Sequence, residues 1–226
     1  MPQRDNPYVQ PIKRRALIAL GANAAAPQGS PAQSLRAAMA QVAALGSAVR
    51  ESRLWRSPAF PAGIGPDFVN AAMVLETERD ADDLLAELHR GEAAFGRERQ
   101  TRWGPRSLDL DLLALDDLVL PDLAAWSLWR DLTPEAQARE TPDRLILPHP
   151  RLQDRGFVLA PLAEVAPDSI SSTVTRNSSM AARRRVSSIT GSSAKGLVTT
   201  TRGSCSQTRP SAAPSCPEVP LNMTAC

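Results

Sequence analysis

Carboxylates and arginines gather in one short stretch of this chain, between Arg97 and Asp111. Asp109 and Asp111 are two residues apart, so on a β-strand both side chains point to the same face of the sheet. Two carboxylates held this close repel each other unless a cation lies between them, and Mg²⁺ prefers oxygen ligands of this kind. The arginines that precede them have planar guanidinium groups, which bind phosphate oxygens in pairs. Together these residue types indicate phosphoryl transfer from a nucleotide.

Each half of this pattern also has an ordinary structural explanation. An Asp-x-Asp pair is more often part of a solvated sheet face, and an arginine-rich loop is usually solvated surface. Trp103, Gly104 and Pro105 fix the backbone between the two halves. Because both halves occur together with this rigid link, the sequence favours a site for phosphate and magnesium.

The carboxylates need a strand to hold them, and hydrophobic spacing predicts both that strand and its neighbours. The predicted elements are strands at 16–20, 49–57, 68–77 and 108–115 and helices at 31–45 and 80–95. Their order is strand, helix, strand, strand, helix, strand. This order predicts an α+β fold of the ferredoxin-like type, an antiparallel sheet with helices on one face.

The composition divides the chain into a globular body and a tail. Residues 1–168 carry 19 basic and 23 acidic residues, whereas residues 169–226 carry 7 basic residues, 1 acidic residue and no aromatic residue. We therefore expect a disordered leader at 1–14, one domain at 15–168 and a disordered tail at 169–226. The Ser- and Thr-rich tail looks like translation in a shifted reading frame. Within the domain, residues 116–143 look like an insertion containing two tryptophans, and a short helix is expected from Gly156.

Charge, cysteine content and hydropathy exclude several classes of protein. The body has a net charge of −4, which disfavours a nucleic-acid binder that would hold phosphate through excess Lys and Arg. The 3 cysteines lie in the tail, without metal-binding or disulfide spacing. The apolar run 16–20 is too short for a signal peptide or a membrane span. We therefore expect a cytoplasmic protein that is not attached to a membrane.

The segment Trp103-Gly-Pro-Arg-Ser-Leu-Asp-Leu-Asp111 resembles the signature of the 6-hydroxymethyl-7,8-dihydropterin pyrophosphokinase family, enzymes of folate synthesis. The resemblance covers about residues 16–168, and the ferredoxin-like fold of that family agrees with the order of elements above. Further segments similar to the family are Ala19-Leu-Gly-Ala-Asn23, Trp55-Arg-Ser57-Pro58, Pro66-Asp-Phe68-Val-Asn70, Leu147-Pro-His149-Pro and Asp154-Arg155-Gly-Phe157.

This resemblance implies transfer of a pyrophosphoryl group from ATP to the 6-hydroxymethyl group of a reduced pterin, with release of AMP. It implies that Asp109 and Asp111 hold two Mg²⁺ ions and form the catalytic centre with Arg97 and Arg106. The residues that it assigns to ATP are Glu92, Arg97, Arg99, Arg106, His149 and Arg155. His89 stands where relatives often have Gln, so the resemblance gives it no definite role.

The resemblance also implies a pterin pocket. Phe68 and Phe157 match a pair that stacks on the two faces of the ring, and Asn70 suits the amide edge of the ring because it has one donor group and one acceptor. The residues expected to complete the pocket are Ser57, Pro58 and Phe60. Without the resemblance, the two phenylalanines would equally be core residues and Asn70 a polar residue satisfied within its strand.

Two alternatives stay open. An RNA-recognition module has the same order of elements, although it needs aromatic residues on a central strand where this chain has Asp109 and Asp111. The chain could also be a family member whose catalysis is impaired by its altered tail. We expect a monomer, and the sequence identifies no general base, with Asp111 as one candidate.

Overall fold

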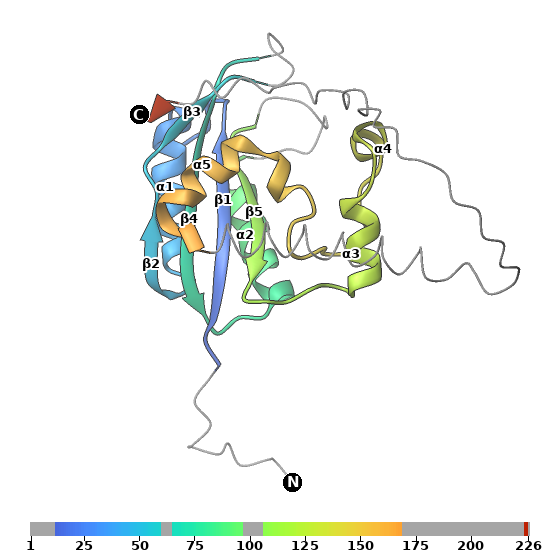
Figure 1. Cartoon of the computed structure of the whole chain (residues 1–226). Coiled ribbons are helices and arrows are strands. Elements are labelled where there is room, and N and C mark those ends of the chain that lie inside the picture. Colours follow the sequence, from blue (N-terminus) through green and yellow to red (C-terminus); the bar gives the residue numbers. More distant parts are fainter. Residues whose placement is uncertain (1–11, 60–64, 97–105, 169–223, 226) are drawn as a thin grey trace, which may run out of the picture.

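The computed structural model describes residues 12–59, 65–96, 106–168 and 224–225, which are built around one antiparallel β-sheet (Figure 1). The strands are β1 (Arg14–Ala22), β2 (Ser47–Glu51), β3 (Trp55–Ser57), β4 (Phe68–Thr77), β5 (Asp109–Leu115) and β6 (Thr224–Ala225). Their order across the sheet is β5-β1-β4-β3-β6, and β2 also pairs with β4. β1 therefore lies between the long strand β4 and the strand that carries the two aspartates.

The helices of the described residues connect and cover these strands. They are α1 (Pro31–Ala43), α2 (Ala81–Ala94), α3 (Leu123–Arg130), α4 (Pro134–Arg139) and α5 (Gly156–Val165), with a 3₁₀ turn at Leu152–Asp154. Ser30 and Asp80 cap α1 and α2, because each has a side-chain oxygen that accepts a backbone N–H of the first turn. The chain order, with β1 and β4 central in the sheet, confirms the ferredoxin-like α+β fold.

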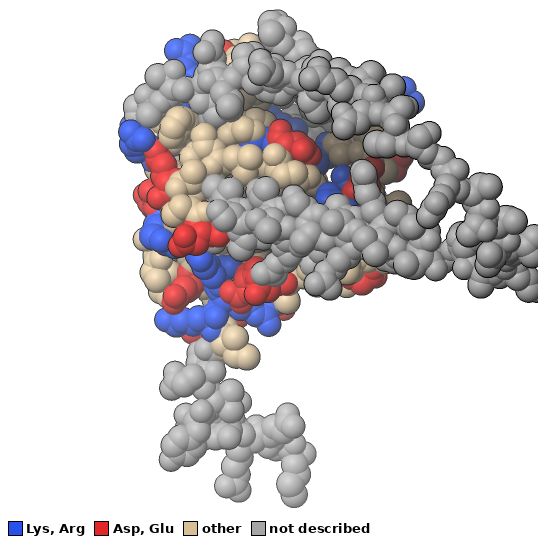
Figure 2. Space-filling model, viewed as in Figure 1, with Lys and Arg blue, Asp and Glu red and all other residues tan. Residues whose placement is uncertain are grey.

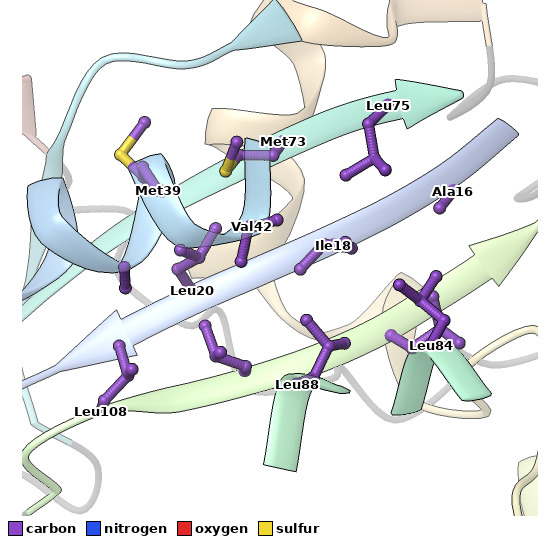
Figure 3. Close-up of a cluster of buried hydrophobic side chains, with 14 of the residues drawn as sticks. Ala16, Ile18, Leu20, Met39, Val42, Met73, Leu75, Leu84, Leu88 and Leu108 are labelled. Atoms are coloured by element: carbon purple, nitrogen blue, oxygen red, sulfur yellow. The ribbon is translucent and has the colours of Figure 1, made fainter. Parts of the chain in front are cut away.

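Both faces of the sheet are covered, which explains why β1 and β4 are apolar along most of their length. Ile18 and Leu20 of β1 pack with side chains of α1 and α2, among them Leu84 (Figure 3). Leu17 and Ala19 point the other way and pack with α5. α1 and α2 thus lie on one face, as predicted, and α5 adds a layer on the opposite face that the predicted arrangement did not include.

The strand predicted at 49–57 is two strands, β2 and β3, and the break falls at Ser52. The backbone N–H of Ser52 donates to the carbonyl of Ala72, and its Oγ accepts the N–H of Ala72, both at 2.9 Å. The hydroxyl thus takes the place of a backbone partner, and the chain changes direction while both segments stay paired with β4. A bond between segments so far apart in the sequence leaves no local signal that could have shown the break.

The two ends of the domain differ from the predicted boundaries. β1 begins inside the predicted leader, because Arg14 pairs with Thr77 of β4. Thr224 and Ala225 pair with β3 and belong to the sheet, unlike the disordered tail expected there. Residues 169–223 and 226 lie outside the described residues, so disorder of that part stays a prediction. In the described part of the chain, no helix combines the length and hydropathy needed to span a membrane.

Candidate active site

Asp109 and Asp111 lie on the face of β5 that is turned away from α1 and α2. Leu110 and Leu112, which alternate with them, are buried in the cluster beneath those helices. The side chains of Asp109 and Asp111 are partly exposed, at 19% and 34%. The shared face predicted from their spacing is therefore confirmed.

A row of residues crosses three strands at this place. Asp109 of β5 is opposite Gly21 of β1, and Gly21 is opposite Asn70 of β4. Neighbouring strands are spaced so that the Cα atoms of Asn70 and Asp109 lie roughly 10 Å apart. A Cβ atom added to Gly21 would lie 3.4 Å from Oδ1 of Asn70, so the open position of the glycine faces the Asn70 amide. Gly21 thus leaves the surface between the amide and the carboxylate clear of side chains from β1.

Arg106 joins the carboxylate end of this row. Its guanidinium forms an ion pair with Asp109. Its backbone is fixed by Asn23, which follows β1: the N–H of Arg106 donates to Oδ1 of Asn23 (2.8 Å), and the N–H of Asn23 donates to the carbonyl of Arg106 (2.9 Å). Asn23 is part of a segment similar to the family, but the sequence did not predict that it fixes Arg106, because these bonds join segments that are distant in sequence.

Arg155 connects the second aspartate to α5. Its Nη1 lies 3.2 Å from Oδ2 of Asp111, and its guanidinium lies 5.9 Å from the ring centre of Phe157. Arg155 precedes α5 directly, so the beginning of this helix is tied to the face of β5 that carries the carboxylates.

The two carboxylates fit a magnesium site. Both are oxygen ligands, both are partly exposed, and both lie on one strand face beside arginines that can balance the charge of phosphate. Within the described ranges, no group of three or more His, Cys, Asp or Glu side chains could enclose a metal ion. Such a donor set suits Mg²⁺, which usually takes only one or two carboxylates and completes its coordination with water and substrate phosphates.

The amide end of the row has the features expected of a pterin pocket. Asn70 is buried, and its amide nitrogen donates to Oγ of Ser57 on β3 at 2.9 Å. This bond fixes which way the amide points. Phe68 begins β4 and shares the face of Asn70, whereas Phe157 at the start of α5 is 41% exposed. An aromatic ring this exposed is not simply part of the core.

Of the other residues expected in this pocket, Pro58 is exposed directly after β3. Phe60 lies outside the described residues, as do the predicted phosphate-binding residues Arg97 and Arg99. Their roles therefore stay predictions.

His149 lies on the turn between α4 and the 3₁₀ turn at Leu152–Asp154, and two bonds to backbone groups hold it there. Its own N–H donates to the carbonyl of Leu113 (2.7 Å), and its Nδ1 accepts the N–H of Arg151 (3.1 Å). Burial, followed by the positive charges of Arg155 and Arg151, lowers the pKa of His149 to about 3, although the charge of Asp109 acts in the opposite direction. The ring is therefore neutral near pH 7, and with Nδ1 as an acceptor its proton is on Nε2, which is a donor.

Glu92 lies on the opposite side of β5 from the aspartates. It is only 3% exposed, and its Oε1 accepts the backbone N–H of Leu110 at 2.8 Å. The structure thus shows Glu92 fixing the strand between the two aspartates, and its expected contact with the nucleotide stays a prediction. His89, one turn earlier on α2, is exposed.

The fold and this site together define a class of protein: a ferredoxin-like α+β enzyme whose paired carboxylates and arginines suit the transfer of phosphoryl or pyrophosphoryl groups. A family model for 7,8-dihydro-6-hydroxymethylpterin-pyrophosphokinase (HPPK) matches residues 17–167. The chain belongs to this family.

Two relatives of known name agree with this assignment. The chain is 35% identical over 158 residues to 2-amino-4-hydroxy-6-hydroxymethyldihydropteridine pyrophosphokinase of Methylorubrum extorquens, which covers 69% of this chain and 85% of the relative. It is 36% identical over 155 residues to the protein of the same name from Synechocystis, which covers 68% of this chain and 67% of the relative. A crystal structure of Plasmodium falciparum HPPK-DHPS is similar with a TM-score of 0.45 and 14% identity, over 69% of this chain and 41% of that chain.

Proposed function

We propose that this chain transfers the pyrophosphoryl group of ATP to the hydroxymethyl group of 6-hydroxymethyl-7,8-dihydropterin, yielding AMP and the pterin diphosphate, in tetrahydrofolate synthesis. Its family supports a diphosphokinase that uses ATP as co-substrate. The observation that carries the proposal is the row of Asn70, Gly21 and Asp109. It holds an amide suited to the pterin and a carboxylate suited to the triphosphate on one face of the sheet.

At the carboxylate end, Asp109 and Asp111 would hold two magnesium ions. Bound there, the ions supply neutralisation of the triphosphate charge. Arg106 and Arg155 are placed beside these carboxylates and would bind phosphate oxygens, together with Arg97 and Arg99. The neutral ring of His149 would donate from Nε2 to the nucleotide without adding charge.

At the amide end, the chain would bind the pterin by its edge and its faces. The bond from the Asn70 nitrogen to Ser57 leaves the carbonyl oxygen of that amide for a ring N–H. Phe68 and Phe157 would stack on the ring, and Pro58 and Phe60 would close the pocket.

The chemical step then needs little beyond positioning. The hydroxyl oxygen of the pterin attacks the β-phosphorus, a new O–P bond forms, the bond from the β-phosphorus to the oxygen shared with the α-phosphate breaks, and AMP leaves with that oxygen. The hydroxyl proton passes to water, directly or through Asp111, the candidate general base. Asn70 and the carboxylate–arginine cluster would hold the two substrates in line, and such alignment supplies a large part of the rate enhancement.

The RNA-recognition alternative finds no support in the described structure. The sheet face that such a module uses is covered here by α5, which packs on β1 and β4. Figure 2 shows acidic and basic side chains interspersed among the described residues of one face of the molecule, where RNA binding would favour a basic surface. We further propose that the chain acts as a monomer.

The test is an assay for AMP in the presence of Mg²⁺, ATP and 6-hydroxymethyl-7,8-dihydropterin. We expect AMP and pterin diphosphate in equal amounts, and neither product when the pterin is omitted. Formation of ADP, or of AMP without pterin, would contradict the proposal. Binding of both substrates without turnover would identify the catalytically impaired alternative.

A further inference from the structure

The segment predicted as an insertion, 116–143, contains a tryptophan whose burial does not serve the core of the domain. Trp126 on α3 is 1% exposed and is among the largest fully buried side chains of the described residues. It belongs to neither of the two hydrophobic clusters that cover the faces of the sheet. Arg130 lies over its ring at 4.9 Å from the ring centre. The burial of Trp126 is therefore explained by contacts near α3 and not by packing against the sheet.

Trp126 contacts the turn that carries His149. The indole Nε1 of Trp126 donates to the carbonyl of Pro148 at 2.7 Å, directly before His149. A buried indole N–H and a buried carbonyl each need a partner, so this bond fixes the two groups against each other.

Two further contacts from the same segment hold the turn. Nη2 of Arg151 donates to the carbonyl of Gln137 in α4 at 2.5 Å. Leu120 and Leu147 form a pair of backbone bonds, at 2.9 Å and 3.3 Å. The segment 116–143 thus holds the turn on both sides of His149, at Leu147 and Pro148 before it and at Arg151 after it.

We infer that α3 and α4 support the His149 turn and that Trp126 and Arg151 are positioning residues for ATP binding. This inference rests on the proposed function, in which Nε2 of His149 contacts the nucleotide. The imidazole direction is set by the N–H of Arg151 at Nδ1 and by the bond of the His149 N–H to Leu113. These two hydrogen bonds hold the imidazole in one direction only while the backbone from Pro148 to Arg151 is fixed.

The experiment measures binding of an ATP analogue with a methylene bridge between the α- and β-phosphorus, in the presence of Mg²⁺, to the full chain. Trp126→Phe keeps an aromatic ring and removes only the N–H donor. We expect the dissociation constant to rise roughly 2- to 10-fold, the effect of one lost hydrogen bond. Trp129→Phe makes the same change three residues later on the same helix and should leave the dissociation constant unchanged.

A double-mutant cycle with His149→Ala shows whether the effect passes through the histidine. His149→Ala should weaken binding of the analogue by itself, and adding Trp126→Phe to it should have no further effect. The KM for pterin should stay unchanged in Trp126→Phe, which shows that the domain is folded. Arg151→Lys should weaken binding of the analogue in the same way. Its control is Arg144→Lys, because Arg144 is exposed.

Three results would overturn the inference. In the first, Trp126→Phe binds the analogue normally while His149→Ala does not, which leaves the proposed function intact. In the second, the two changes weaken binding additively, so that Trp126 acts without His149. In the third, His149→Ala binds the analogue normally, and the assignment of His149 to the nucleotide in the proposed function then fails as well.

Discussion

Asp109 and Asp111 each have a guanidinium partner within the chain, Arg106 and Arg155. Hydrogen bonds to the backbone hold the segments around these ion pairs. Asn23 fixes the backbone of Arg106, and Glu92 fixes the backbone of Leu110 between the two aspartates. The charged groups are thus held in place by neutral backbone bonds, which is the arrangement that electrostatic catalysis needs.

Replacing Asp109 or Asp111 by Asn should lower turnover at least about 100-fold, the scale of losing one preoriented electrostatic group. The amide keeps the size of the side chain but loses the charge that a magnesium ion requires. The measurement is kcat at several Mg²⁺ concentrations, with Asp143→Asn as a control, because that carboxylate is exposed and pairs with neighbouring Arg144. Normal magnesium-dependent turnover of both variants would reject the assignment.

His149 makes the free energy of unfolding depend on pH. Its pKa is lowered to about 3 in the folded chain by burial and by Arg155 and Arg151, against an ordinary value of 6.5. Between these two values the unfolded chain takes up a proton that the folded chain does not, so stability is lost as the pH falls below 6.5. At about 1.4 kcal/mol per pH unit, the loss from pH 7 to pH 5 is about 2 kcal/mol.

Denaturant unfolding at pH 7 and pH 5 measures this loss. His149→Gln cannot take up the proton and should lose less stability over the same range. Glu164, whose pKa is lowered because its bonds to Arg53 outweigh its burial, affects stability only at lower pH, so it does not interfere. An equal pH dependence in the two proteins would show that His149 is not held neutral by the fold.

At the scale of elements, local patterns predicted β1, β4, β5, α1, α2 and α5, but not the break between β2 and β3, the elements α3, α4 and β6, or the register of the strands. The runs that form β1 and β4 are apolar along most of their length, and in β5 leucines alternate with the two aspartates. Ser30 and Asp80 mark the starts of α1 and α2. The sequence also placed Asp109 and Asp111 on one face. It could not show that Gly21 separates Asn70 from Asp109, because strand register depends on pairing between distant segments. The support of His149 by Trp126 was hidden for the same reason.

The register gives a prediction about Gly21. Valine at this position favours a strand, but its side chain would stand between the Asn70 amide and the Asp109 carboxylate. Gly21→Val should therefore raise the dissociation constant of the pterin at least about 10-fold, the scale of overpacking a fitted site. Gly21→Ala, whose Cβ would lie 3.4 Å from Oδ1 of Asn70, should have a smaller effect. Calorimetry with folded Gly21→Val that shows unchanged pterin affinity would mean that the ring does not bind along this row.

At the scale of the whole molecule, the two edges of the sheet are covered by different segments of the chain. β5 forms one edge, where the carbonyl of Leu113 accepts the backbone N–H of His149. At the other edge, β3 pairs with the two residues of β6. The sequence predicts a disordered tail, because residues 169–226 lack the apolar spacing of a packed element, and we expect the tail to be dispensable. The two residues of β6 are too few to change this expectation. The few backbone bonds of β6, at about 1 kcal/mol each, are offset by ordering costs of about 1–2 kcal/mol per residue.

A chain that ends at Asp168 should therefore keep its activity, and its melting temperature should fall by less than about 4 °C, the effect of about 1 kcal/mol in a domain of this size. Removing β6 leaves the edge of β3 open, and an open edge can pair with another chain. The shortened chain should therefore show more self-association at high concentration, measurable by sedimentation. Arg56→Pro would remove a backbone donor from β3 and should reduce that association. A loss of many degrees in melting temperature together with loss of activity would instead mean that the tail is a structural part of the enzyme.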